Sequence, residues 1–342
     1  MKNSSIFILF ALLLSTTAGA KLNGKNVVLV HGLQTTHLGQ APNDAGLQSD
    51  ANEYWEEYWG QRAEAILYWS ATDRVAGGIK DDMRAQIKQL ETQGLCRDGC
   101  VFVTHSTGDL VLRDALSRLN QWSVNSNDFS VIATLDFAGA GGGSELADLA
   151  VNITEGGGLV NAAARGAVNL FLGFTPTSSN IGVLHDLRPN AARQIATQNL
   201  AIPRLRFAGA GSEFLRATKV FLPGSDDAVV AMHSACGARY KNSYDSCSRS
   251  VRSNGAIRSA SGPSSFYYNH YPVLMGDDTD HFEAITRDRT GYMTPVVNNV
   301  TRGVRVDFNT YVKSRFLRSN LLRVRDSDDK SMSANVYDTL NQ

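Results

Sequence analysis

The sequence lacks an excess of either charge and lacks long hydrophobic runs. Lysine and arginine total 33 in 342 residues, aspartate and glutamate also total 33, and the formal net charge is zero. This balance gives no indication of a nucleic acid or an anionic membrane surface as a partner. After the first twenty residues, no apolar run reaches the roughly 20 residues that span a bilayer. The composition therefore favours a globular chain of one large domain or two small ones.

Cysteine is also scarce, with four residues that fall into two local pairs. Cys96 and Cys100 flank a short Arg-Asp-Gly turn, and Cys236 and Cys247 flank a polar loop. Outside the cytoplasm this spacing indicates two disulfides. The same cysteines could suggest a metal site, but secretion favours disulfides. We therefore expect neither a metal nor a cofactor.

The first twenty residues have the pattern of a secretory signal peptide. Lys2 supplies a positive start, residues 6–14 are an unbroken apolar run, and residues 18–20 form a small-residue cleavage site. The residue directly after that site is Lys21 and not a cysteine, which argues against a lipid anchor. We expect residues 1–20 to be removed, and the mature chain to begin near Lys21 and act outside the cytoplasm, in the periplasm or the medium.

Short β-branched runs alternate with amphipathic segments along most of the chain. Strands are predicted at 25–30, 65–70, 101–104, 131–137 and 204–208, and helices at 53–63, 79–93 and 108–119. This alternation predicts an α/β fold, with a mostly parallel central sheet and helices on both faces. The glycine run after residue 138 is too dense for a dinucleotide-binding fingerprint.

A serine stands where one strand ends and the next helix begins. The segment Thr104-His105-Ser106-Thr107-Gly108 predicts a tight strand-to-helix turn, with a small residue at Gly108 where another chain segment passes close by. Such a turn exposes the Ser106 hydroxyl in a cleft and directs the Thr107 amide to the same point. Alternatively, a serine after a strand can simply cap a helix.

The rest of a hydrolytic site follows in a fixed order along the chain. In an open parallel sheet, functional groups lie on loops at the carboxyl ends of strands. Ser106, then Asp226 and Asp227 beyond a strand ending near Leu222, then His281, give the order serine, acid, histidine. The loop after residue 30 offers the Leu33 amide as a second oxyanion donor, beside that of Thr107.

These segments resemble bacterial secreted lipases and esterases of the α/β-hydrolase superfamily. The resemblance covers roughly residues 25–235 and rests on 30–33, 104–108, 143–148, 184–189 and 226–230. It implies an α/β-hydrolase fold and a catalytic triad of Ser106, Asp227 and His281. It also implies Leu33 and Thr107 as oxyanion donors, with Asp226 and His270 as alternates for acid and base.

The chain departs from the family pattern at two places. The Thr-Pro-His element after the predicted strand at 131–137 is replaced by residues 136–139, and residues 236–268 form a serine-rich surface insertion between Asp227 and His281. We expect a hydrolase domain over 21–320 and a polar, frayed tail over 321–342. Within the domain, residues 150–200, with a soft apolar stretch at 156–180, form either buried helix or a lid over the cleft.

The predicted function is hydrolysis of carboxylic esters through an acyl-enzyme, with a small-molecule or lipid ester as substrate. A lid would imply transient contact with a lipid interface. Two alternatives remain open: an acyltransferase in which an alcohol replaces water, and a secreted binding protein that keeps the fold without turnover. The acyl length, calcium requirement and oligomeric state do not follow from the sequence.

Overall fold

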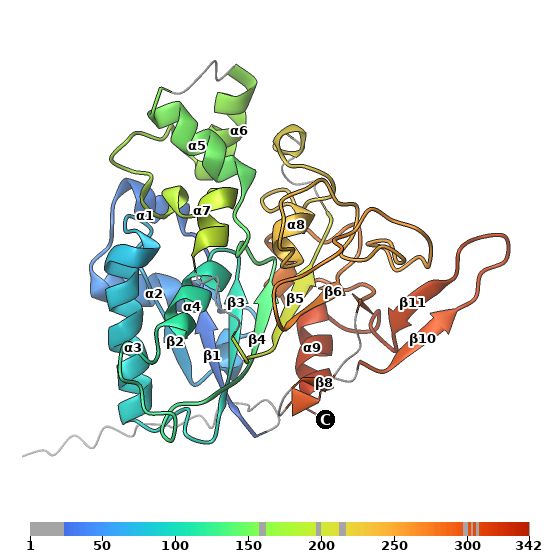
Figure 1. Ribbon diagram of the computed structural model, residues 1–342, viewed down its shortest axis with the longest axis horizontal. Helices are drawn as coiled ribbons and strands as arrows, with labels where there is room; N and C mark the ends of the chain where they lie inside the picture. The colour runs from blue at the N-terminus through green and yellow to red at the C-terminus, as the bar shows by residue number, and fades with distance from the viewer. Residues whose placement is uncertain are drawn as a thin grey trace, which may run out of the picture.

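Among the described residues a seven-stranded sheet forms the centre of the protein (Figure 1). Its order is β2-β1-β3-β4-β5-β6-β7, and all neighbours are parallel except β6 and β7. The strands are Asn26–Val30 (β1), Ala65–Leu67 (β2), Cys100–His105 (β3), Val131–Phe137 (β4), Arg204–Ala208 (β5), His270–Leu274 (β6) and Thr294–Pro295 (β7). The computed structural model describes residues 24–156, 162–195, 200–211, 217–296, 300–301, 304–305 and 308–341, so the predicted signal peptide at 1–20 lies outside the described residues.

Helices cover both faces of this sheet, as the alternation of strand and helix patterns predicts. Val28 and Val30 of β1 belong to one hydrophobic core, together with apolar side chains of α3 and α4. Val27 and Leu29 point to the opposite face and belong to a second core. The helices are Thr35–Gly39 (α1), Asp44–Tyr54 (α2), Lys80–Thr92 (α3), Gly108–Ser117 (α4), Glu145–Thr154 (α5), Ala162–Leu172 (α6), Pro189–Gln194 (α7), Met232–Ala235 (α8) and Met332–Leu340 (α9).

The aromatic segment at 53–63 differs from its prediction as a helix. Helix α2 begins earlier, where the Asn43 side chain accepts a hydrogen bond from the Gly46 amide at 3.0 Å and caps the helix. It ends at Tyr54, and Trp55 and Trp59 in the following turns are fully buried in the second core. The aromatic spacing therefore reflects burial against the sheet and not a continuous helix.

The predicted frayed tail at 321–342 is wrong for its described part, residues 321–341. Residues Leu321–Val324 form β11, and α9 packs Val336 and Leu340 into the second core. Ser331 caps this helix by accepting from the Ala334 amide at 3.1 Å. Apolar side chains spaced four residues apart in a mainly polar sequence give this helix one buried face.

Outside the central sheet, two short hairpins and a long loop region complete the described fold. Strands Thr310–Lys313 (β10) and β11 form one antiparallel pair, and Val300–Thr301 (β8) and Val304–Arg305 (β9) form another. Helices α5 and α6 stand above the sheet in Figure 1. None of the helices in the described ranges is long and apolar enough to cross a membrane.

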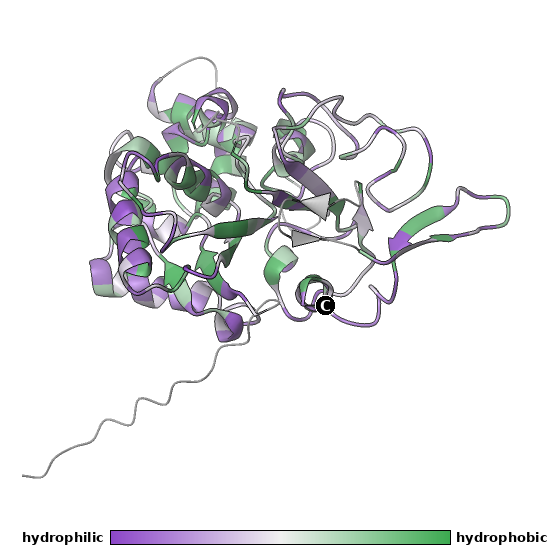
Figure 2. Ribbon diagram, turned by 60° about the horizontal axis from the view of Figure 1, so that its bottom comes forward, coloured by the Kyte–Doolittle hydropathy of each residue, from purple (hydrophilic) through white to green (hydrophobic). Residues whose placement is uncertain are grey.

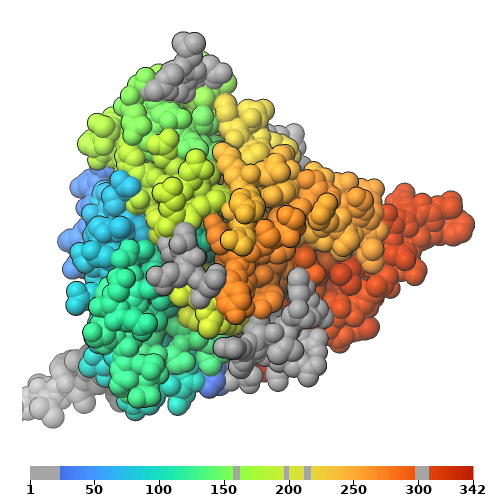
Figure 3. All heavy atoms as spheres, viewed as in Figure 1, coloured from blue at the N-terminus to red at the C-terminus, as the bar shows by residue number. Residues whose placement is uncertain are grey.

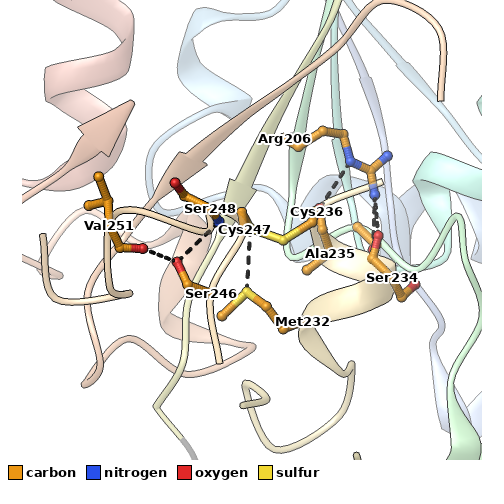
Figure 4. Close-up of a disulfide and its surroundings, with 10 residues drawn as sticks. Arg206, Met232, Ser234, Ala235, Cys236, Ser246, Cys247, Ser248 and Val251 are labelled. Carbon is orange, nitrogen blue, oxygen red and sulfur yellow. Dashed lines mark hydrogen bonds between the residues drawn. A yellow bond between two sulfur atoms is a disulfide. The ribbon is translucent and has the colours of Figure 1, made fainter. Parts of the chain in front are cut away.

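Both predicted disulfides are present. Cys96 is bonded to Cys100, and Cys236 to Cys247. Figure 4 shows the second bond at the end of α8, close to Arg206 of β5. The Arg206 guanidinium donates to the carbonyl oxygens of Ser234 and Ala235, both at 3.0 Å. The disulfide therefore connects the 236–268 region to a helix that is itself bound to the sheet.

Candidate active site

Ser106 occupies a strained turn between β3 and α4. Its φ of 55° lies in the left-handed region, which residues other than glycine rarely adopt. The turn is tight because α4 passes directly behind β1: a Cβ atom at Gly108 would overlap the carbonyl oxygens of Val30 and His31. The predicted strand-to-helix turn with its obligatory small residue is therefore present in the structure.

Thr104, where the usual pattern has glycine, makes a specific contact. Its hydroxyl donates a hydrogen bond of 2.7 Å to Asp136 on the neighbouring strand β4. Asp136 is fully buried and accepts two further bonds from Arg204, at 2.9 and 3.0 Å. Threonine at this position connects the turn to a buried charged cluster beneath it.

Four charged side chains form that buried cluster: Asp109, Asp136, Arg204 and Arg206. Arg204 contacts both carboxylates at 2.9 Å, and Arg206 contacts Asp109 at 2.6 Å. Burial alone would raise the pKa of Asp109, but the two guanidinium groups outweigh it and lower the pKa below its ordinary value. Asp109 lies in the first turn of α4, where a carboxylate complements the helix dipole. In the structure it also binds β5 and the Gly141 amide.

His281 and Asp227 form a hydrogen-bonded pair. His281 Nδ1 donates to Asp227 Oδ2 at 2.9 Å, and the His281 amide donates to the Asp227 carbonyl, also at 2.9 Å. The other carboxylate oxygen accepts from the amides of Val229 and Val230, at 3.1 and 2.7 Å. These bonds hold Asp227 in place. Because Nδ1 of His281 is used in this pair, Nε2 is the ring nitrogen that can act as a base toward another group.

The alternates Asp226 and His270 lie elsewhere. Asp226 accepts from the Ala228 amide at 2.9 Å, and burial raises its pKa to about 6. His270 begins β6 and lies against Gly237, where burial and nearby arginines lower its pKa well below the ordinary value. Neither is among the described residues that line the cavity next to Ser106.

The acid turn follows a different element from the one predicted. The sequence indicated a strand ending near Leu222, but residues Lys219–Phe221 form a short 3₁₀ helix. The described strand that precedes this turn in the chain is β5. An apolar run of three residues is too short to distinguish a strand from a helical turn.

A cavity of about 110 Å³ brings the predicted residues together. Ser106 and His281 both line it, as do Leu33 and Thr107, the predicted oxyanion donors. Most other lining residues are apolar and come from four segments: Ala140, Ala147, Phe171, Leu184, Leu187, Val229 and Val230. The cavity thus places Ser106 and His281, which is hydrogen-bonded to Asp227 behind it, beside a wall suited to a hydrocarbon chain.

The loop that carries Leu33 is held by His31. The Trp69 amide donates to His31 Nε2 at 3.2 Å, so Nδ1 carries the proton and donates to the Gly32 carbonyl at 2.7 Å. The ring stacks on that of Trp69, and burial lowers its pKa to about 4. A neutral, fixed imidazole therefore positions the loop beside Ser106.

Sequence reasoning missed the roles of Tyr54 and His105. His105 Nε2 donates to the His281 carbonyl at 2.8 Å, and its Nδ1 accepts from the Tyr54 hydroxyl. No local pattern could indicate this contact, because Tyr54 lies within the segment predicted as a helix at 53–63 and His105 lies within the serine turn. Tyr54 and Phe282 also separate the cavity from a second hollow of about 290 Å³, lined by Glu53, Glu57 and Tyr58.

The sheet order, its parallel strands and the strained serine turn define an α/β-hydrolase fold. No family model matches the chain, and no curated protein matches it. Among solved structures it is similar to the mature lipase BlEst2 of Bacillus licheniformis, with 16% identity, a TM-score of 0.47, and coverage of 79% of this chain and 89% of that one. It is also similar to a metagenomic carboxyl esterase, with 18% identity, coverage of 64% and 61%, and a TM-score of 0.39. The phospholipase PlaB of Legionella pneumophila gives 17% identity, coverage of 62% and 45%, and a TM-score of 0.38.

Proposed function

We propose that the protein is a carboxylic ester hydrolase of the lipase and esterase type. The observation that carries the proposal is the strained serine, Ser106, in one apolar cavity with a histidine, His281, that is hydrogen-bonded to a buried carboxylate, Asp227. A left-handed serine costs folding free energy, so its presence in the wall of a cavity favours a chemical role.

In the proposed mechanism, the Ser106 hydroxyl attacks the acyl carbonyl while His281 Nε2 takes its proton. Asp227 stabilises the imidazolium that forms, and the amides of Leu33 and Thr107 bind the oxyanion. The tetrahedral intermediate collapses to an acyl-enzyme, and the departing alcohol takes the proton from His281. Water then attacks the acyl carbonyl while His281 Nε2 takes its proton, and collapse of the second tetrahedral intermediate releases the carboxylic acid and returns that proton to Ser106 Oγ.

The two disulfides fit a protein that acts in an oxidising compartment. We therefore propose that the chain is exported, in keeping with the signal-peptide pattern of residues 1–20.

The test is a panel of p-nitrophenyl esters of increasing acyl length, run on the wild type and on Ser106→Ala. We expect hydrolysis by the wild type and only background hydrolysis by the variant, with unchanged far-UV circular dichroism. A fluorophosphonate probe should label the wild type at Ser106. An unlabelled, inactive wild type would instead support a binding protein that keeps the fold without turnover.

A further inference from the structure

The β10–β11 hairpin projects from the body of the protein and carries two exposed apolar side chains at its tip. The projection is plain in Figures 1 and 2, and the space-filling view in Figure 3 shows it as a protruding knob. Phe316 is 90% exposed and Leu317 is 89% exposed, more than any other large hydrophobic side chain among the described residues. Adjacent apolar side chains this exposed are unusual in a globular protein and indicate an interaction surface.

The backbone conformation of Leu317 is unfavourable in free energy, in addition to the exposure of its apolar side chain. Its φ of 57° lies in the left-handed region, where glycine or asparagine is the usual residue. A bulky leucine held in this conformation and left in water does not stabilise the isolated protein. Its presence is explained if the side chain is buried against something else.

The hairpin is also strongly basic, which the charge balance of the whole chain conceals. Residues 308–325 contain five cations and no acidic residue, in a protein whose net charge is zero. Lys313, Arg315 and Arg318 flank the apolar tip, and none of them makes an ion pair with another described residue. Arg258, from the neighbouring loop, shares a hollow of about 420 Å³ with Arg315, Leu317 and Arg318. The tip therefore combines a small apolar wedge with a ring of positive charge.

The base of the hairpin is fastened to the rest of the fold. The Ile257 amide donates to the Asn320 carbonyl at 2.7 Å, and the Leu322 amide donates to the Gly255 carbonyl at 2.8 Å. The Val324 amide donates to the Met293 carbonyl at 2.9 Å. These bonds fix the base of the hairpin, so the tip with Phe316 and Leu317 stands away from the body of the protein.

We propose that this tip docks the protein on an anionic lipid surface. Phe316 and Leu317 insert between lipid chains, while Lys313, Arg315, Arg318 and Arg258 contact the phosphate groups of the lipids. A convex tip with two apolar side chains falls far short of the roughly 800 Å² per partner that stable protein interfaces bury. A fluid bilayer accepts such a wedge without a matching groove, and its negative charge complements the arginines.

Co-sedimentation with vesicles tests the proposal. The full chain without residues 1–20 is mixed with phosphatidylcholine vesicles, with or without added phosphatidylglycerol. We expect binding to the anionic vesicles that falls with salt. The charge variant Arg315→Gln/Arg318→Gln should bind them roughly 30-fold more weakly, since each cation near the surface contributes about fivefold. The tip variant Phe316→Ser/Leu317→Ser, which keeps every positive charge, should also lose binding to the anionic vesicles.

Matched controls separate the hairpin from general effects of charge and apolarity. Val220→Ser removes an apolar side chain that is 79% exposed elsewhere, and Arg97→Gln/Arg287→Gln removes two exposed charges elsewhere. Both controls should bind like the wild type, and urea unfolding should show that the hairpin variants remain folded. Equal losses in the controls, or a wild type that stays in the supernatant, would overturn the proposal.

Two further outcomes are informative. Ser106→Ala should bind vesicles like the wild type, because docking does not depend on the proposed ester chemistry. Sedimentation equilibrium should find the same mass for the wild type and the tip variant. A wild type that dimerises, with a monomeric tip variant, would identify a second copy of the chain as the occupant and contradict lipid docking.

Discussion

At the residue scale, two adjacent aspartates experience opposite surroundings. Asp227 accepts three hydrogen bonds, from His281 and from the amides of Val229 and Val230. Asp226 accepts one, from the Ala228 amide, and its second carboxylate oxygen is buried without a partner among the described residues. The difference arises because successive side chains in a turn point in different directions. We therefore expect substitutions of Asp227 and of Asp226 to have different effects.

Replacing Asp227 by asparagine should reduce ester hydrolysis about 10⁴-fold, because the amide allows the wrong imidazole tautomer and no longer stabilises the imidazolium. Initial rates on a p-nitrophenyl ester measure this. Asp226→Asn is the matched control and should retain most of the activity. A larger loss in Asp226→Asn than in Asp227→Asn would reverse the assignment of the acid.

Asp226 should make stability depend on pH. Burial raises its pKa from 3.8 to about 6, so the fold favours the protonated form. Its stabilising contribution is complete below pH 3.8 and is lost as the pH rises through 6. Relative to the wild type, Asp226→Asn should gain up to about 3 kcal/mol between pH 4 and pH 8. Urea unfolding at both pH values tests this, and a difference that stays constant would contradict it.

At the element scale, α6 contributes to the wall of the cavity. Phe171 lines the cavity, whereas its neighbour Leu170 is 53% exposed. Phe171→Ala should enlarge the space for the acyl chain and shift the preference toward longer esters, measured as the ratio of kcat/KM for octanoate and butyrate. Leu170→Ala should leave that ratio unchanged. The lid interpretation of 150–200 stays a prediction, tested by whether activity rises at an oil–water interface.

Element types followed from the sequence where a strong pattern lay within a few residues. Strands β1 and β3 each contain four consecutive apolar residues, β4 is apolar except at Thr134 and Asp136, and α3 has apolar residues at helical spacing. Helix α2 was missed because its sequence is mainly polar and its Asn43 cap went unrecognised. Helix α9 lies where a frayed tail is predicted, because its Ser331 cap and its two apolar residues four apart are weak signals in a mainly polar sequence and its stability comes from packing on the sheet.

The sequence could predict only those parts of the candidate site whose order along the chain is set by the fold. The turn at Ser106, the acid turn and a late histidine are recognisable because parallel strands deliver their loops to one edge. The contact of Tyr54 with His105, 51 residues apart, depends on how α2 packs. The cluster of Asp109, Asp136, Arg204 and Arg206 is likewise a product of strand register, in which Asp136 pairs with Arg206 across β4 and β5.

At the scale of the whole molecule, the Cys236–Cys247 disulfide and the buried charged cluster both hold the end of α8. Cys236 and Cys247 close a loop at the end of α8, whose carbonyl oxygens bind Arg206 of the charged cluster (Figure 4). Reduction should therefore loosen the region between the acid turn and His281 as well as lower global stability.

Full reduction should lower the free energy of unfolding by roughly 2–3 kcal/mol for the longer of the two loops, with a smaller loss for the Cys96–Cys100 loop. Urea unfolding with and without a phosphine reductant measures this. The variant Cys236→Ser/Cys247→Ser should show the larger part of the loss without reductant and a smaller further loss with it, from the Cys96–Cys100 bond. A reductant effect of the same size in that variant would assign the stabilisation to the other disulfide.

At position 106 the left-handed backbone favours glycine for stability, whereas the proposed reaction needs the serine hydroxyl. Glycine adopts this φ without strain, so Ser106→Gly should unfold at a higher urea concentration than Ser106→Ala, although both lack the hydroxyl. Selection for thermal tolerance alone would thus favour an inert protein with glycine at position 106. The strained serine at position 106 therefore supports the catalytic role that we propose for its hydroxyl.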